Sequence, residues 1–164
     1  MAYSSKAVAN YFLDLAKESD SSLTPMKLQK LIYFAHGWSL AIYDEPLISE
    51  TIEAWRYGPV VPTIYHEFKD CGSGSITDFA TEIELVGDDG LEFCTPQITK
   101  DDEKTKALLN KVWEIYGKYS GVALSNLTHK PETPWAKVWD INTPKGTDIP
   151  QNVIKKYFQS IAAK

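Results

Sequence analysis

The sequence of 164 residues has little cysteine and no long apolar run. Its two cysteines, Cys71 and Cys94, lie far apart and outside any Cys-x-x-Cys pair, which argues against a disulfide framework and a thiolate zinc cluster. No window approaches the roughly 18 uncharged apolar residues of a membrane-spanning helix, and residues 1–10 lack the pattern of a signal peptide. We therefore expect free, buried thiols in a cytoplasmic protein with no membrane partner.

Basic residues are also in deficit. The chain has 22 acidic and 17 basic residues and a net charge of -5. A surface of this sign is unsuited to neutralising many phosphates, so we expect no nucleic-acid partner. An acidic surface favours encounter with a basic protein instead, because complementary charge raises association rates.

Helical periodicity dominates the chain, whose composition is 43% hydrophobic and 24% charged. These values are typical of one globular domain with a real core, here spanning residues 1–164. Apolar spacing predicts helices over residues 5–17, 25–43, 61–69, about 100–119 and 122–128, with two more that begin near 135 and 150. Thr99, with Asp102 three residues later, resembles a capping box at the start of the fourth helix.

The predicted helix over residues 25–43 differs from the others. Thr24 supplies a capping hydroxyl, and Pro25 occupies the first helical position. The helix is apolar on nearly every face, which is typical of a buried element, so we expect it at the centre of the fold. Its inward stripe is expected to consist of Leu28, Leu31, Ile32, Ala35 and Ile42.

Two short stretches indicate extended backbone. Residues 52–57 favour a strand closed by Gly58-Pro59, and alternation on either side of Gly-Asp-Asp-Gly predicts a hairpin over residues 81–86 and 91–95. The expected fold class is therefore mainly α (α+β): a single compact helical domain around a buried central helix, with a small β-hairpin and short strands.

Three histidines are available for catalysis or metal binding. His66-Glu67 resembles the start of a zinc-protease His-Glu-x-x-His motif, but Asp70 stands where the second histidine is required. Ser125 and His129 are four residues apart on one helical face, yet no Gly-x-Ser-x-Gly elbow surrounds the serine. A structural role is expected for each histidine, so the protein is not expected to be an enzyme. A histidine- or metal-dependent hydrolase remains a weaker alternative.

Three stretches resemble one known family. They are residues 25–38 (PMKLQKLIYFAHGW), residues 53–68 (EAWRYGPVVPTIYHEF) and Leu-Thr-His with Thr-Pro-Trp between 127 and 135. In order and spacing the chain is similar to the Panacea domain, a family that includes Soc-type antitoxins and phage-associated proteins, and the similarity extends from about residue 5 to 158. The family-motif residues are His36, Trp38, Tyr65, Phe68, Leu127 and Thr128.

The resemblance implies a bacterial or phage type II antitoxin that neutralises a cognate protein toxin by direct binding, without a cofactor. The toxins of the family are varied, and small-alarmone-synthetase-like or other translation-blocking enzymes are prominent among them. One branch of the family acts instead as an adaptor that delivers its toxin to a cytoplasmic protease, and this alternative stays open. Five tryptophans exceed what a small core usually needs, so some are available for an interface.

A partner-binding surface is expected around the Gly-Pro-Val turn and the segment Leu124 to Trp135. The competing interpretation is that the same residues hold together one joint inside the domain. The residues concerned are Trp55, Tyr57, Gly58, Pro59, His129 and Trp135.

Overall fold

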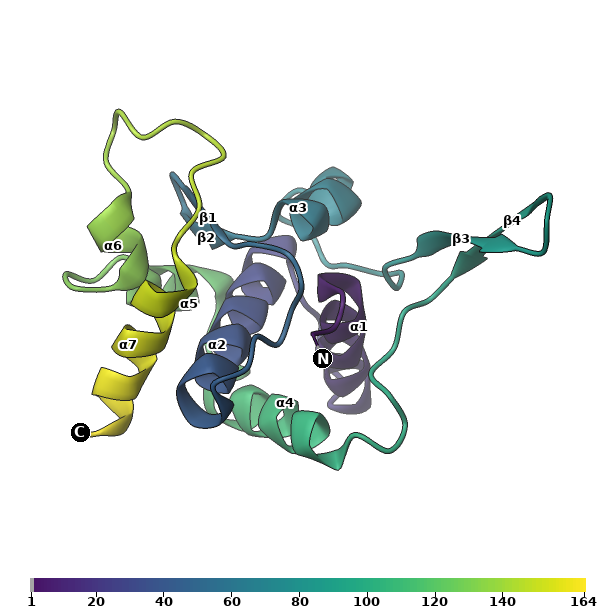
Figure 1. The fold of residues 1–164 in the computed structure, drawn as a ribbon, viewed down its shortest axis with the longest axis horizontal. Helices are drawn as coiled ribbons and strands as arrows, with labels where there is room; N and C mark the ends of the chain where they lie inside the picture. The colour runs from purple at the N-terminus through teal and green to yellow at the C-terminus, as the bar shows by residue number, and fades with distance from the viewer. Residues whose placement is uncertain (1) are drawn as a thin grey trace.

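Helix α2 (Pro25–Tyr43) lies at the centre of the fold. The structure is a computed structural model that describes residues 2–164. Helix α2 contacts five other helices and strand β2. Around it lie α1 (Ser5–Glu18), α3 (Pro62–Phe68), the 3-10 turn η1 (Lys69–Cys71), α4 (Glu103–Tyr116), α5 (Gly121–Thr128), α6 (Pro134–Val138) and α7 (Gln151–Ala162) (Figure 1). The predicted mainly helical class with a buried central helix is confirmed.

The helix starts follow local capping chemistry. Ser4, Thr24, Ser120 and Thr133 each accept a hydrogen bond from the backbone N–H three residues later, which satisfies a donor that the helix itself leaves unpaired. The expected capping box at Thr99 is wrong, because α4 begins after Asp102. That carboxylate accepts from the Thr105 N–H at 3.0 Å and from the Tyr3 hydroxyl at 2.6 Å.

The core is built on α2. Leu28, Leu31, Ile32 and Ala35 have no exposed surface. Ile42, which the sequence places on the same stripe, is instead 58% exposed, because no other element covers this side of the last turn within residues 2–164.

Helix α7 packs on α2 through one aromatic cluster. The Phe158 ring is fully buried and meets the rings of Tyr33, Phe34 and Trp38 edge to face, with centroids 5.1 to 6.0 Å apart. Gly37 permits this approach, because a Cβ at that position would lie 2.2 Å from a ring carbon of Phe158.

Two antiparallel strand pairs complete the fold. β1 (Glu53–Trp55) pairs with β2 (Gly58–Val60), so Gly58 and Pro59 form a second strand, whereas the sequence suggested that they only end the first. β3 (Glu82–Val86) pairs with β4 (Gly90–Cys94), which confirms the predicted hairpin. This second hairpin projects away from the helices (Figure 1), and we call residues 82–94 the arm.

Both cysteines are free, as predicted. Each is half-buried where a buried thiol was expected, because Cys71 ends the surface turn η1 and Cys94 lies at the base of the arm. Among residues 2–164, no helix is both long enough and apolar enough to span a bilayer.

The α2–α7 contact gives a direct test of the fold. Gly37→Ala is expected to lower the free energy of unfolding by about 1–3 kcal/mol, because the clash with Phe158 outweighs the better helix propensity of alanine. Urea unfolding measures this. The double variant with Phe158→Leu should lose less than the sum of the two single variants, because a smaller side chain relieves the clash. Additive losses would contradict the close approach.

Candidate functional site

The segment between α5 and α6 forms a joint with strand β1. Trp135 is only 7% exposed, and its indole Nε1 donates to the backbone oxygen of Trp55 at 2.6 Å. Its ring lies between those of His129, with centroids 4.0 Å apart, and Trp139, at 5.0 Å. Most of the Trp135 surface is therefore already used inside the chain.

His129 is held by backbone acceptors. Its Nδ1 lies 2.6 Å from the Ser125 oxygen, and its Nε2 lies 3.4 Å from the Arg56 oxygen. A carbonyl only accepts, so Nδ1 carries the proton in the shorter bond. The Ser125 hydroxyl donates to the Tyr57 oxygen at 3.1 Å. The serine and histidine are adjacent, but the hydroxyl does not bond to the imidazole as a nucleophile and base would require.

Gly58 and Pro59 lie beneath this joint and are both buried. Gly58 has φ +117°, and a Cβ there would lie 3.0 Å from Thr128 Oγ1 and 3.1 Å from the Lys30 ammonium. Only glycine suits this position. Of the six predicted partner-binding residues, Tyr57 is the most exposed, at 65%, while Trp55 and His129 are half-buried. Their role in binding a partner stays a prediction.

The family-motif residues are divided between the core and the surface. Trp38 donates to the Tyr116 hydroxyl at 3.0 Å, Phe68 and Thr128 are buried, and Leu127 is half-buried. Tyr65 is exposed and meets the Trp55 ring edge to face at 4.9 Å.

His36 has the structural role that the sequence suggested. Its Nδ1 accepts from the Leu47 N–H at 3.2 Å, and its Nε2 lies 2.5 Å from Gln151 Oε1. Burial lowers the pKa of this imidazole, which keeps it neutral at pH 7. Within residues 2–164, the structure brings no three histidine, cysteine, aspartate or glutamate side chains together as a metal site.

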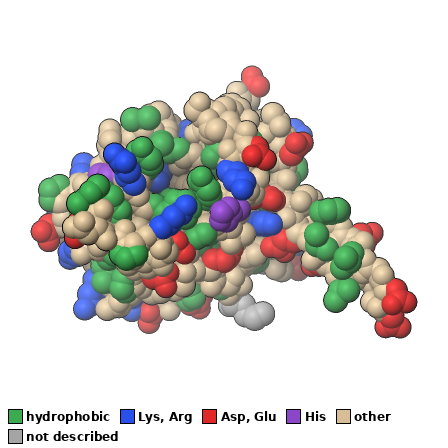
Figure 2. Space-filling view, turned by 90° about the horizontal axis from the view of Figure 1, so that it is seen from above, with side chains coloured by type: hydrophobic (Ala, Val, Ile, Leu, Met, Phe, Trp, Pro, Cys, Tyr) green, Lys and Arg blue, Asp and Glu red, His purple; other side chains and the backbone are tan. Residues whose placement is uncertain are grey.

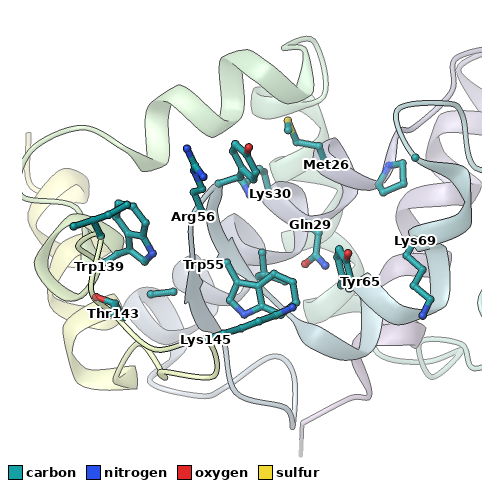
Figure 3. Close-up of a pocket in the computed structure, with 16 residues that line it drawn as sticks. Met26, Gln29, Lys30, Trp55, Arg56, Tyr65, Lys69, Trp139, Thr143 and Lys145 are labelled. Carbon is teal, nitrogen blue, oxygen red and sulfur yellow. The ribbon is translucent and has the colours of Figure 1, made fainter.

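A pocket of about 700 Å³ opens beside the joint (Figure 3). Its walls come from α2, the β1–β2 hairpin, α3 and the loop before α7. Backbone hydrogen bonds from Ala54 to Thr147 and from Ile149 to Ile52, both 2.8 Å, hold that loop against β1. The lining residues are Pro25, Met26, Gln29, Lys30, Ala54, Trp55, Arg56, Tyr57, Val60, Tyr65, Lys69, Gly72, Trp139, Ile141, Thr143 and Lys145.

Lys30 is the unexpected member of this lining. Its side chain is 2% exposed, and its Nζ donates to the Pro59 oxygen at 3.3 Å. Burial lowers the pKa of this ammonium from 10.5 to about 8. Sequence reasoning missed it, although a lysine inside a helix apolar on nearly all faces is a usable signal.

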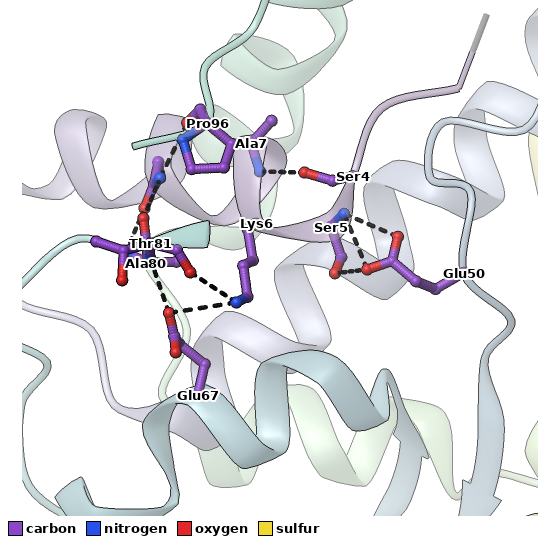
Figure 4. A network of polar contacts seen from close by, with 10 residues as sticks. Ser4, Ser5, Lys6, Ala7, Glu50, Glu67, Ala80, Thr81 and Pro96 are labelled. Atoms are coloured by element: carbon purple, nitrogen blue, oxygen red, sulfur yellow. Dashed lines mark hydrogen bonds and ion pairs between the residues drawn. The ribbon is translucent and has the colours of Figure 1, made fainter. Parts of the chain in front are cut away.

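Hydrogen bonds from α1 hold the chain on both sides of the arm. The Asn10 amide donates to the Ala80 oxygen, just before β3, at 3.0 Å and to the Pro96 oxygen, just after β4, at 2.9 Å. Its Oδ1 accepts from the Ala80 N–H at 2.8 Å. Lys6 adds a bond to the Thr81 oxygen at 2.7 Å and an ion pair with Glu67 at 3.6 Å (Figure 4).

One face of the arm is apolar and is not covered by any other part of residues 2–164. Residues 83 and 85 of β3 stand opposite 93 and 91 of β4, so all four side chains share one face. They are 60% to 77% exposed, namely Ile83, Leu85, Leu91 and Phe93. Figure 2 shows hydrophobic side chains along the arm and acidic ones at its tip.

These features define a mainly helical domain that has a pocket and a projecting apolar arm. The sequence pattern described as "Antitoxin SocA-like, Panacea domain" matches residues 28–136. The chain is also 31% identical over 157 residues to "Antitoxin SocA" of Caulobacter vibrioides (strain NA1000 / CB15N), which covers 94% of this chain and 81% of that protein. The chain belongs to the SocA-like antitoxin family and carries its Panacea domain, as its motifs predicted. No solved structure matches it.

Substitution of Trp135 distinguishes a structural role in the joint from a role in binding a partner. Trp135→Phe is expected to lower the free energy of unfolding by about 1–3 kcal/mol, because it leaves the partly buried Trp55 oxygen without the indole donor. Thermal and urea unfolding of the purified chain measure the loss. An unchanged melting temperature combined with lost toxin neutralisation would contradict the joint and favour direct contact with the partner.

Burial of Lys30 is expected to lower the free energy of unfolding at neutral pH. The unfolded chain keeps the lysine proton up to about pH 10.5, and the folded chain releases it near pH 8, a difference worth about 3 kcal/mol. The unfolded state therefore binds more protons between these values, and stability should rise with pH across that window.

Lys30→Met should accordingly be more stable than the wild type at pH 7, by up to about 3 kcal/mol. Its free energy of unfolding should show little of the increase between pH 8 and 10.5 that is expected for the wild type. Urea unfolding at several pH values tests this. The exposed Lys118→Met is the matched control and should change neither quantity. A less stable Lys30→Met would show that the Pro59 bond outweighs the cost of burial.

Proposed function

We propose that this protein is a type II antitoxin that neutralises a cognate protein toxin by direct binding, without catalysis, and that the apolar face of the arm is its main contact surface. The observation that carries the proposal is the row of four large apolar side chains on one face of an otherwise isolated hairpin. Membership of an antitoxin family supports the role.

Exposure of the apolar face of the arm to water is energetically unfavourable for a protein without a partner. A lone two-stranded hairpin is marginally stable in water, and contiguous exposed apolar patches typically mark interaction sites. Burying an Ile, Leu or Phe side chain contributes about 1.5–3 kcal/mol. Four such side chains in one patch supply the kind of anchor that dominates protein interfaces.

The base of the arm makes it suitable for presenting that face. Asn10 bonds to the chain on both sides of the arm, and Lys6 and Glu67 bond to Thr81. These bonds hold the ends of the arm on α1, so less conformational freedom is lost when a partner binds.

Charge on the arm indicates the chemistry of the partner. Glu82, Glu84 and Glu92 alternate with the apolar residues and occupy the opposite face, and Asp88 and Asp89 form the loop at the tip. An apolar face with three carboxylates on its reverse and two at its tip suits a toxin surface whose hydrophobic centre has basic residues around it.

Growth rescue tests both parts of the proposal. The chain is co-expressed with the toxic product of the neighbouring open reading frame, and wild type is expected to restore growth. Leu85→Ser with Phe93→Ser should abolish rescue and co-purification while leaving the melting temperature within about 2 °C, because exposed positions contribute little to stability. Ile42→Ser on α2 removes an exposed apolar side chain outside the arm and should rescue fully.

The outcomes separate the claims. Failure of wild type to rescue overturns the antitoxin function. Rescue by the double arm variant leaves that function standing and overturns the arm as its surface. A fall in toxin level that requires an intact cytoplasmic protease would show delivery to the protease in place of direct inhibition.

A further inference from the structure

The pocket beside the joint has a charge opposite to that of the whole protein. Four of its lining residues are basic and none is acidic, although the chain carries a net charge of -5. The basic residues are Lys30, Arg56, Lys69 and Lys145. Figure 2 shows basic side chains among hydrophobic ones in the middle of the face on which β1, β2 and α3 lie. A concave region of one charge concentrates ligands of the other.

Lys30 supplies a buried donor that the fold leaves largely unused. An ammonium has three N–H donors, and the acceptor found here is the Pro59 oxygen at 3.3 Å, longer than a strong charge-assisted bond. A group with a pKa near 8 remains mainly charged at pH 7. An anion in the pocket would provide the missing acceptors and the missing countercharge together.

Four of the other lining residues are aromatic. Tyr57, Tyr65 and Trp139 line the pocket with Trp55, whose ring carries the Lys145 ammonium at 4.3 Å from its centroid (Figure 3). A volume of about 700 Å³ lies within the range of small-molecule sites, which are mostly apolar with a few convergent polar groups. Such walls suit a planar ring by stacking.

We propose that this pocket binds a small phosphate-bearing molecule with a planar ring, of the nucleoside diphosphate class, with Lys30 as the buried cation that contacts the phosphate. Arg56 and Lys145 stand where they can neutralise further charge, and the aromatic walls hold the ring. This site lies apart from the arm and does not depend on the proposed toxin binding, so the purified chain alone can test it.

Titration calorimetry and tryptophan fluorescence measure the binding, since Trp55 and Trp139 line the pocket. Adenosine and guanosine diphosphates are expected to bind saturably, and uncharged adenosine and inorganic phosphate at least tenfold more weakly. Lys30→Met should weaken nucleotide binding at least tenfold while remaining folded by circular dichroism. Lys118→Met, which removes an exposed lysine outside the pocket lining, should bind as wild type does.

Three results would overturn the proposal. The first is no saturable binding of either nucleotide at millimolar concentration. The second is equal affinity of wild type and Lys30→Met. The third is binding of inorganic phosphate as tight as that of the nucleotides, which would leave the aromatic walls without a role. None of these results bears on growth rescue, so the antitoxin proposal is judged separately.

Discussion

Burial of α2 on nearly all sides is the constraint on which the rest of the structure depends. A helix that is apolar on nearly every face must be covered on nearly every face, and α1, α3, α4, α5, α7 and β2 all contact it. The same burial encloses the polar residues that the helix carries. Lys30 and His36 are placed in the interior by their neighbours, and each then needs a partner there.

Buried polar side chains position the loops around that helix. Gln29 bonds to both the N–H and the oxygen of Val61, at 2.9 and 3.0 Å, and Asn10 does the same to Ala80. An unpaired buried polar group costs about 1–3 kcal/mol, so each bond strongly favours one loop position. The pocket and the arm therefore stand on segments that have little regular structure of their own but are held by specific bonds.

Local chemistry accounts for what the sequence predicted well. Thr24 caps α2 because the donor that it satisfies lies three residues away. The arm was likewise visible as alternation around a glycine-flanked loop. That pattern normally indicates a half-buried strand, and the exposure of Phe93 and Leu85 could not be read from it. Whether an apolar face is covered depends on the elements packed beside it.

The sequence by itself determined the Thr24 cap of α2, the central position of that helix, the arm hairpin and membership of the SocA-like antitoxin family, because each rests on residues close together in the chain or on a motif. Only the tertiary structure decided that Trp135 is used within the fold and that Lys30 forms part of a pocket. The Trp135 bond to Trp55 joins residues 80 positions apart, and the Lys30 bond to Pro59 joins residues 29 apart. Contacts over such separations are set by the packing of whole elements, which no local pattern records.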